Sequence, residues 1–259
     1  MQRFIKQPNK STYPTENRTR MRLIRIAPAA LALPLLMANT SAPVSVNKRV
    51  FTVNVTAATV VTENSDCYTA WKLDASGISK EAFENAMKGY QQLLRKNMLQ
   101  KANVITIVDY SLPSTQKRLY VLDMSDGKVL FHSLAAHGRN SGLLYAANFS
   151  NQPSSLKTSL GFFITGTTYT GNNGYSLKLN GCEKGINDKA MQRAIVIHGA
   201  AYVSENFIQQ TGYLGRSHGC PAIPENISHK LIDVIKGGSC VFLYHPEKNY
   251  SVHSKILNS

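Results

Sequence analysis

The sequence predicts a mostly β, α+β fold with a few helices. Short β-branched runs bounded by turn residues fill most of the chain after residue 101, whereas only two segments carry apolar residues at helical spacing. Hydrophobic residues make up 43% of the 259 residues, and charged residues 17%. A chain of this length and composition can bury a full core, so one folded domain behind an N-terminal leader is the simplest organisation.

The first 42 residues contain the three parts of a secretory signal peptide. Four arginines between positions 18 and 25 form a basic n-region, residues 26–37 (IAPAALALPLLM) form an apolar h-region, and residues 40–42 (TSA) form a small-residue cleavage site. This apolar run is short and contains two prolines, so it is poorly suited to span a bilayer. We therefore expect an exported protein of the periplasm or cell envelope, with an uncleaved membrane anchor as the alternative.

Four parts are predicted along the chain: a signal peptide over 1–42, a linker and N-terminal helical segment over 43–100, a β-rich domain over 101–248 and a C-terminal tail over 249–259. Met21 is an alternative start, because the residues before it add little that a signal needs. The stretch from Pro43 to Asp66 is rich in Thr and Val and lacks a helical period, which is typical of a linker or an edge strand.

The first helix is predicted to begin after Ser79, which can cap it, with Ile78 and Phe83 as the apolar pair around the cap. Apolar residues then recur at helical spacing and are predicted to pack in the core: Phe83, Met87, Tyr90, Leu94 and Met98. A second helix is predicted after Pro224, ending at Gly237-Gly238, with Ile227, Leu231, Val234 and Ile235 on one face.

The strands are predicted from short β-branched runs. Residues 104–108, 119–122 and 129–131 are separated by turn residues, which indicates an antiparallel meander. Further strands are predicted at 161–166, 175–179, 194–198 and 240–244, with Gly/Asn clusters between some of them.

The formal net charge of +14 includes the leader. Without residues 1–42, the chain retains 22 basic and 14 acidic side chains. Such a surplus suits an anionic polymer, and nucleic acid, a membrane surface and the cell wall all qualify. The export signal argues against nucleic acid. No Lys/Arg block of five or more occurs, so a generally basic surface is the alternative to a dedicated polyanion site.

The chain has four cysteines, at positions 67, 182, 220 and 240. In an oxidising compartment an even number suggests disulfide bonds. If Cys220 stays free as a nucleophile, at most one bond can form, and it uses two of Cys67, Cys182 and Cys240. The sequence does not assign the pairing.

The segment from Ser217 to Pro221 (SHGCP) has the residues that cysteine nucleophilic chemistry needs. Gly219 leaves room for an acyl carbon to approach Cys220, and nearby backbone amides can face the developing oxyanion. Pro221 has no N–H, so oxyanion donors must come from Cys220 and the residues before it. His198 ends an apolar strand and is the predicted general base. The alternative is an inert buried thiol and a structural histidine.

These residues resemble the murein L,D-transpeptidase catalytic domain family. Residues 198–200 (HGA) and 215–222 (GRSHGCPA) resemble its histidine and its Ser-x-Gly-Cys signature, in the branch that has Pro-Ala after the cysteine. The similarity continues upstream in residues 137–142 (HGRNSG), 149–151 (FSN) and 158–163 (TSLGFF), so it covers residues 100–245.

The resemblance implies a β-sandwich or barrel and makes 101–248 the catalytic domain. In this family the cysteine attacks a stem-peptide bond of peptidoglycan after a diamino acid and expels the terminal D-residue, and an amine then resolves the acyl-enzyme. By matching position, Cys220 is the nucleophile, His198 the base and Gly219 part of the oxyanion region, while Ser217 and His218 flank the site as substrate-binding residues. No cofactor is implied.

Other residues are weaker candidates. Arg216 and Arg139 are predicted to pair with stem-peptide carboxylates, because a guanidinium fork suits a carboxylate, although an exposed arginine can simply be solvated. Tyr202 is predicted to line the donor groove or to pack. Better-known members of the family usually place an arginine shortly after the cysteine, whereas residues 221–224 (PAIP) are apolar here. No metal site is predicted, and a zinc site using His198, His218, Cys220 and His229 is the minor alternative.

Three functions are consistent with the sequence. The first is a transpeptidase whose acceptor is an amine on a stem peptide or on an envelope protein. The second is an L,D-carboxypeptidase or endopeptidase that resolves the same thioester with water. The third is a non-catalytic cell-wall-binding protein, which the joint presence of Cys220 and His198 disfavours. The long polar loop 140–159 is a predicted lid, because a lid that excludes water decides between the first two.

The leader gives the first testable prediction. Cleavage after residue 42 should yield a mature protein that begins near Pro43 and is found in the cell envelope. N-terminal sequencing of the native protein checks this. Recovery of an intact Met1 or Met21 terminus from the cytosol would contradict it.

Overall fold

The computed structural model describes residues 67–259. The predicted signal peptide over 1–42 and the predicted linker or edge strand over 43–66 lie outside the described residues. A 3-10 turn, η1 (Leu73–Ser76), leads into the long helix α2 (Lys80–Arg95).

Helix α2 begins where the sequence predicts. The Ser79 hydroxyl accepts a hydrogen bond from the Ala82 N–H at 3.2 Å, and it donates one to Asp109 Oδ2 at 2.9 Å. Ile78 and Phe83 are both buried, as expected for the apolar pair around the cap.

The predicted apolar stripe of α2 is wrong at its last two positions, because Leu94 and Met98 are 43% and 39% exposed. The residue that continues the buried face from Tyr90 is Leu93, three positions on, and the helix ends at Arg95, before Met98.

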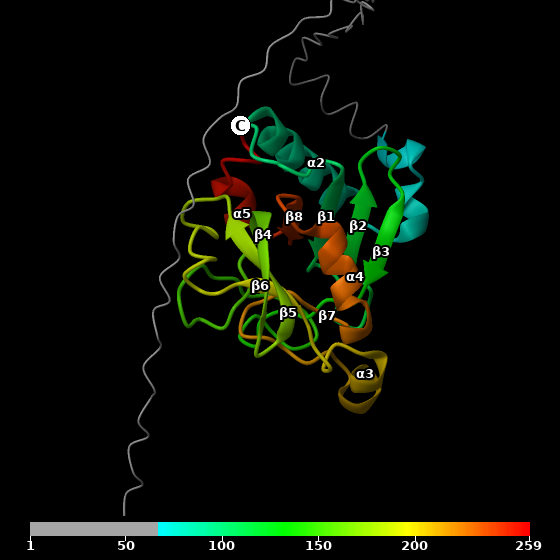
Figure 1. Ribbon diagram of the computed structural model, residues 1–259, viewed down its shortest axis with the longest axis vertical. Helices are drawn as coiled ribbons and strands as arrows, with labels where there is room; N and C mark the ends of the chain where they lie inside the picture. Colours follow the sequence, from blue (N-terminus) through cyan, green and yellow to red (C-terminus); the bar gives the residue numbers. More distant parts are fainter. Residues whose placement is uncertain (1–66) are drawn as a thin grey trace, which may run out of the picture. The chain divides into compact units, whose positions relative to one another are not determined.

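The centre of the fold is one eight-stranded sheet with the order β3-β2-β1-β8-β4-β5-β6-β7 (Figure 1). Its strands are β1 (Val104–Asp109), β2 (Leu119–Asp123), β3 (Val129–Ser133), β4 (Gly161–Gly171), β5 (Gly174–Gly181), β6 (Val196–Gly199), β7 (Ala222–Ile223) and β8 (Cys240–Tyr244). Strands β1, β2 and β3 form the predicted antiparallel meander, while β8 joins β1 in parallel.

The two edges of this sheet meet beyond β3. The Ala136 N–H donates to the Ala222 carbonyl at 2.8 Å, and Gly138 forms a parallel bridge with Ser217. The chain that leaves the β3 edge therefore pairs with β7 and the residues before it, so the sheet forms a near-barrel. The predicted mostly β fold with a few helices is confirmed.

Two helices cover the sheet. Helix α2 packs on β1 and β8, and α4 (Glu225–Ile235) packs on β6, β5 and β1 (Figure 1). The rings of Phe162 and Phe242 stack in the core at 4.1 Å between centroids. A Cβ on Gly89 would lie 1.9 Å from the Phe162 ring, so only glycine lets α2 approach the sheet this closely.

Several elements differ from the sequence expectation. The β4–β5 hairpin extends to the turn at Gly171–Gly174, beyond the predicted strand ends. Helix α3 (Glu205–Thr211), capped by Ser204, is absent from the prediction because it buries no residue and so has no apolar stripe. Within residues 67–259, no helix has both the length and the apolar character needed to cross a membrane.

The chain end packs against the same core. Helix α5 (Lys248–His253) buries Tyr250, whose hydroxyl donates to Glu183 Oε2 at 3.2 Å. The Ser254 hydroxyl bonds the other oxygen of this buried carboxyl, and the Phe162 N–H donates to Oε2 at 2.8 Å. Burial raises the pKa of Glu183, against the lowering effect of these donors.

Candidate active site

The turn before Cys220 is held by Ser217. The Ser217 N–H donates to the His137 carbonyl at 3.0 Å, and the Ser217 carbonyl accepts from the Arg139 N–H at 2.8 Å. The Ser217 hydroxyl donates to the Cys220 carbonyl at 2.6 Å and accepts from the Gly219 N–H at 3.0 Å. This buried hydroxyl therefore closes the turn that presents Cys220.

Gly219 has a φ of +123°, a conformation that residues with side chains rarely adopt. A Cβ at this position would lie 2.8 Å from the Lys157 carbonyl, so the loop 140–159 leaves no room for one. The Gly219 N–H is already bonded to Ser217. Within the described part of the chain, the Cys220 N–H makes no hydrogen bond, which leaves it available to an oxyanion.

Cys220 is half-buried, and its sulfur lies at the start of β6. The thiol donates to the Ala194 carbonyl at 3.8 Å. Burial raises the pKa of Cys220, and this effect exceeds the lowering by the Val196 N–H and by the positive charge of Arg193. The resting group is consequently a thiol at neutral pH, and it needs a base to become a nucleophile.

His198 lies in β6, and its backbone pairs with Ala222, two residues after Cys220. Its Nδ1–H donates to the Gly199 carbonyl at 2.9 Å, which leaves Nε2 with the free lone pair. Burial lowers the pKa of His198, so the imidazole is neutral at pH 7 and can accept a proton. No hydrogen bond joins the imidazole to the Cys220 thiol in the described residues, and a resting site often brings base and nucleophile together only when substrate binds.

Three of the weaker candidates line one hollow of about 300 Å³. Arg139, Tyr202 and Arg216 share it with Phe207, Thr211, Tyr213 and Gly215. The Arg216 guanidinium lies 5.5 Å from the centre of the Tyr213 ring. Burial and the nearby Cys220 raise the pKa of Tyr202 to about 12, so this hydroxyl keeps its proton at neutral pH.

A second, smaller hollow of about 180 Å³ lies on the β6 side of the thiol. Ala194, Ile195 and Val196 line it, together with Met191, Tyr169 and Lys178. Ala194 and Val196 are also the residues whose backbones contact the Cys220 sulfur. Each hollow thus contains residues that interact with Cys220, Tyr202 in one and Ala194 and Val196 in the other.

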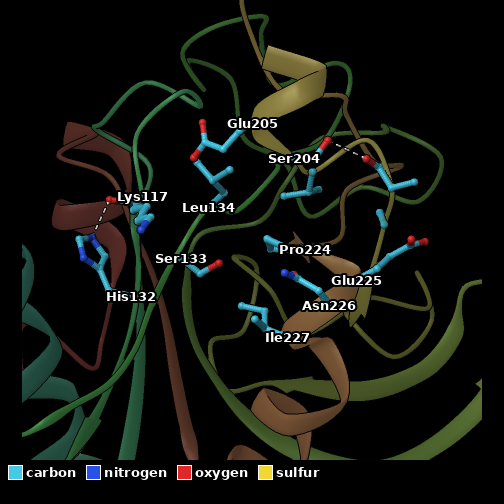
Figure 2. Close-up of a pocket in the computed structure, with 13 residues that line it drawn as sticks. Lys117, His132, Ser133, Leu134, Ser204, Glu205, Pro224, Glu225, Asn226 and Ile227 are labelled. Carbon is cyan, nitrogen blue, oxygen red and sulfur yellow. Dashed lines mark hydrogen bonds between the residues drawn. The ribbon is translucent and has the colours of Figure 1, made fainter. Parts of the chain in front are cut away.

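A larger cavity lies elsewhere and contains none of the predicted site residues. It measures about 560 Å³ and lies between β3 and the starts of α3 and α4 (Figure 2). Ser133 and Leu134 line one side, and Pro224 and Glu225 line the other. This position is the seam of the near-barrel, which the Ala136–Ala222 and Gly138–Ser217 bridges close.

The other predicted residues are placed as follows. His218 is exposed, next to the buried turn. His229 stacks on Tyr175, with 4.8 Å between ring centroids. In residues 67–259, no group of three or more His, Cys, Asp and Glu side chains is arranged to hold a metal ion. Cys240 is buried and Cys182 is half-buried, each as a thiol.

One residue of the site, Arg118, is not predicted from the sequence. Arg118 is fully buried, and neither of the two ion pairs in the described residues includes it, although the charge of Asp109 acts on it. Its Nε and Nη2 donate to the Ala135 carbonyl at 2.9 and 2.8 Å, its Nη1 donates to the Leu112 carbonyl at 2.7 Å, and Nη2 also donates to His137 Nδ1 at 2.8 Å. The guanidinium also lies 4.9 Å from the centre of the Tyr110 ring. No local pattern marks this residue, because all these partners come from tertiary structure.

The protein has a mostly β near-barrel in which a cysteine turn is followed by a strand that pairs with the strand of a histidine. This combination defines a class of protein, which the sequence comparison identifies. The sequence model of the L,D-transpeptidase catalytic domain matches residues 74–244, so the chain belongs to this family, whose enzymes act on peptidoglycan. The resemblance found in the sequence is confirmed. Comparison with curated protein sequences finds no match.

Solved L,D-transpeptidase structures are similar to the chain at low identity. One is the enzyme from Mycobacterium smegmatis, with 15% identity and a TM-score of 0.35, covering 55% of this chain and 59% of that chain, which is less than two thirds of its length. Another is the enzyme from Stackebrandtia nassauensis, with 15% identity and a TM-score of 0.33, covering 73% and 80%. A third is the helical cell shape determining protein of Campylobacter jejuni, with 17% identity and a TM-score of 0.38, covering 67% and 61%.

The buried His137 gives a pH prediction. Burial, with the charge of Arg118, lowers the pKa of His137 from 6.5 to about 4. On unfolding the histidine returns to its ordinary pKa, so the unfolded chain binds more protons between these values. Stability should therefore fall as the pH drops from about 6.5 to about 4, by ~3 kcal/mol from this residue alone.

Urea unfolding of the wild type and of His137→Asn from pH 7.5 to pH 4.5 measures this effect. The asparagine keeps an acceptor for Arg118 but does not titrate. The stability difference between the two proteins should shrink as the pH falls. Parallel profiles across the whole range would contradict the assignment.

Proposed function

We propose that the protein is a cysteine-dependent peptidoglycan L,D-transpeptidase of the cell envelope. The observation that carries the proposal is the position of Cys220: its thiol bonds the Ala194 carbonyl just before β6, the strand that holds the neutral His198 with a free Nε2. Membership of the L,D-transpeptidase family supports peptide-bond transfer as the reaction at this site.

The proposed acylation begins with proton transfer from the Cys220 thiol to His198 Nε2. The thiolate attacks the carbonyl carbon of the diamino acid in the donor stem peptide, and the oxyanion that forms is bonded by the Cys220 N–H. The carbon–nitrogen bond then breaks, the imidazolium gives its proton to the departing D-residue, and a thioester remains. The neutral resting state of both groups suits this order of events.

In the second half, an amine of an acceptor stem peptide attacks the thioester. His198 takes the amine proton as the carbon–nitrogen bond forms, the carbon–sulfur bond breaks, and the imidazolium returns the proton to the sulfur to restore the thiol. The loop 140–159 supports this outcome over hydrolysis, because it packs on Gly219 through Lys157 and shields one side of the thioester from water. An amine on an envelope protein stays a prediction from the sequence.

Donor recognition is assigned to the arginine-lined hollow. Arg139 and Arg216 have no carboxylate partner among the described residues, and both line a cavity together with Tyr202, a residue on which Cys220 acts electrostatically. A stem peptide carries carboxylates, and a guanidinium binds a carboxylate in a two-pronged arrangement. The basic surplus of the chain acts in the same direction, since peptidoglycan is anionic.

Replacing the nucleophile tests the mechanism directly. Cys220→Ala should abolish turnover, and Cys220→Ser should do nearly the same, because a hydroxyl is far less acidic than a thiol. Tetrapeptide-bearing muropeptides serve as substrate, with D-alanine release and new cross-links followed by mass spectrometry. A carbapenem should add its mass to the wild type and not to Cys220→Ala.

Undiminished activity in Cys220→Ala would end the proposal. Release of D-alanine by the wild type without any cross-link would move the assignment to an L,D-carboxypeptidase. Thermal melting of each variant shows whether the fold is retained, which we expect because the Cys220 side chain is half-buried and its sulfur bonds only the backbone of Ala194 and Val196 in the described structure.

Replacing His198 and His218 separately tests which histidine is the base. His198→Ala should slow acylation by about a hundredfold or more, which is the usual effect of losing a positioned base. His218→Ala should cost much less, because this side chain is exposed and makes no hydrogen bond in the described structure. Single-turnover acylation by a carbapenem measures both variants. Equal losses, or a larger loss in His218→Ala, would contradict the assignment of His198 as the base.

A further inference from the structure

Arg193 lies in the turn before β6, five residues before His198, and belongs to none of the sequence motifs described above. Its half-buried guanidinium bonds one loop at four points. Nη1 donates to the Ser150 carbonyl at 2.6 Å and to the Ser159 hydroxyl, and Nη2 donates to the Ser155 hydroxyl at 3.3 Å and to the Lys157 carbonyl. Arg193 therefore fastens residues 150–159, the second half of the predicted lid, to the base of β6.

The same guanidinium lies against the nucleophile turn. A Cβ on Gly219 would lie 3.1 Å from Arg193 Nη2, so the arginine contacts the backbone directly before Cys220. The residue after Arg193 is Ala194, whose carbonyl accepts the Cys220 thiol hydrogen bond. Two consecutive residues, Arg193 and Ala194, thus approach the turn and the sulfur.

The charge of Arg193 is not neutralised by a carboxylate. Neither of the two ion pairs in the described residues includes it, and its four partners are uncharged. The segment after Cys220, residues 221–224, is apolar and supplies no cation. Arg193 is therefore placed to act on a negative sulfur from the other side of the turn.

Three titratable groups around Cys220 are neutral at pH 7. Tyr110 and Tyr202 both have a raised pKa, caused first by burial and with a contribution from Cys220 itself. His198 has a lowered pKa, again because of burial. The pKa of Cys220 is lowered by the hydrogen bond from the Val196 N–H and by the positive charge of Arg193.

We propose that Arg193 is the positioning residue of the nucleophile, holding a fixed positive charge beside the Cys220 thiolate while it fastens residues 150–159 over Gly219. One residue then couples closure of the loop to formation of the reactive sulfur. A loop that moved away from the turn would also release the guanidinium that stabilises the thiolate. The inference rests on the proposed role of Cys220 as nucleophile.

The experiment measures the sulfur itself. The mature protein is alkylated with iodoacetamide from pH 6 to pH 10, and the peptide that contains Cys220 is quantified by mass spectrometry, separately from the peptides of Cys67, Cys182 and Cys240. Arg193→Gln removes the charge but keeps hydrogen-bond donors toward the loop, whereas Arg193→Lys keeps the charge. Lys189→Met is the matched control, because Lys189 lies in the same turn and its Nζ bonds Gln152 of the same loop at 3.3 Å.

Arg193→Gln should move the midpoint of Cys220 alkylation to higher pH and slow the rate at pH 7 by about tenfold, with the limiting rate at high pH retained. Arg193→Lys should keep most of the wild-type midpoint, and Lys189→Met should keep all of it. Wild-type midpoints in both arginine variants, or an equal loss of rate at every pH, would overturn the proposal, because a purely structural role shifts no midpoint.

Thermal melting identifies which variants are folded. If Arg193→Gln is not folded, Arg193→Met takes its place. Alkylation needs no substrate, so the result does not depend on transpeptidase activity. If the wild type makes no cross-links but Arg193→Gln still shifts the midpoint, the proposed function fails and the inference about Arg193 stands.

Discussion

The buried Arg118 is the constraint on which the rest of the site depends. Taking a guanidinium out of water costs several kcal/mol unless its donors are bonded. Here the donors are bonded by the carbonyls of Leu112 and Ala135 and by the ring of His137, rather than by a carboxylate. Burial lowers the pKa of Arg118 to about 10, so the charge is still present at neutral pH. The charge therefore fixes the chain on either side of Ala136.

The fixed segment around Ala136 also holds the turn that ends in Cys220. His137 and Arg139 bond both backbone groups of Ser217, and Ser217 closes the turn that ends in Cys220. Ala136 pairs with Ala222 on the far side of the nucleophile, and Ala222 also pairs with His198. The nucleophile and the predicted base are thus both positioned by one strand-like segment that follows β3, which explains why a residue 102 positions before Cys220 governs its geometry.

The sequence predicts the parts of this structure that depend on local pattern. The Ser79 cap, the meander from β1 to β3 and helix α4 are visible as spacing of apolar and capping residues, and the Ser217–Pro221 turn is visible as a motif. Helix α3 escapes prediction because it buries no side chain, and β7 because two residues carry no period. Arg118 and Arg193 are missed for a different reason: Arg118 bonds the chain around Ala135 and His137, Arg193 bonds the loop around Ser150 and Lys157, and no spacing rule encodes such partners.

The two hollows share no lining residue, and each contains residues that interact with Cys220: Tyr202 in one, Ala194 and Val196 in the other. In the proposed mechanism, a site with a single opening must lose its first product completely before a second substrate can reach the same carbon. Two separate hollows would remove that requirement, because the departing D-residue and the arriving amine would then occupy different places around the thioester.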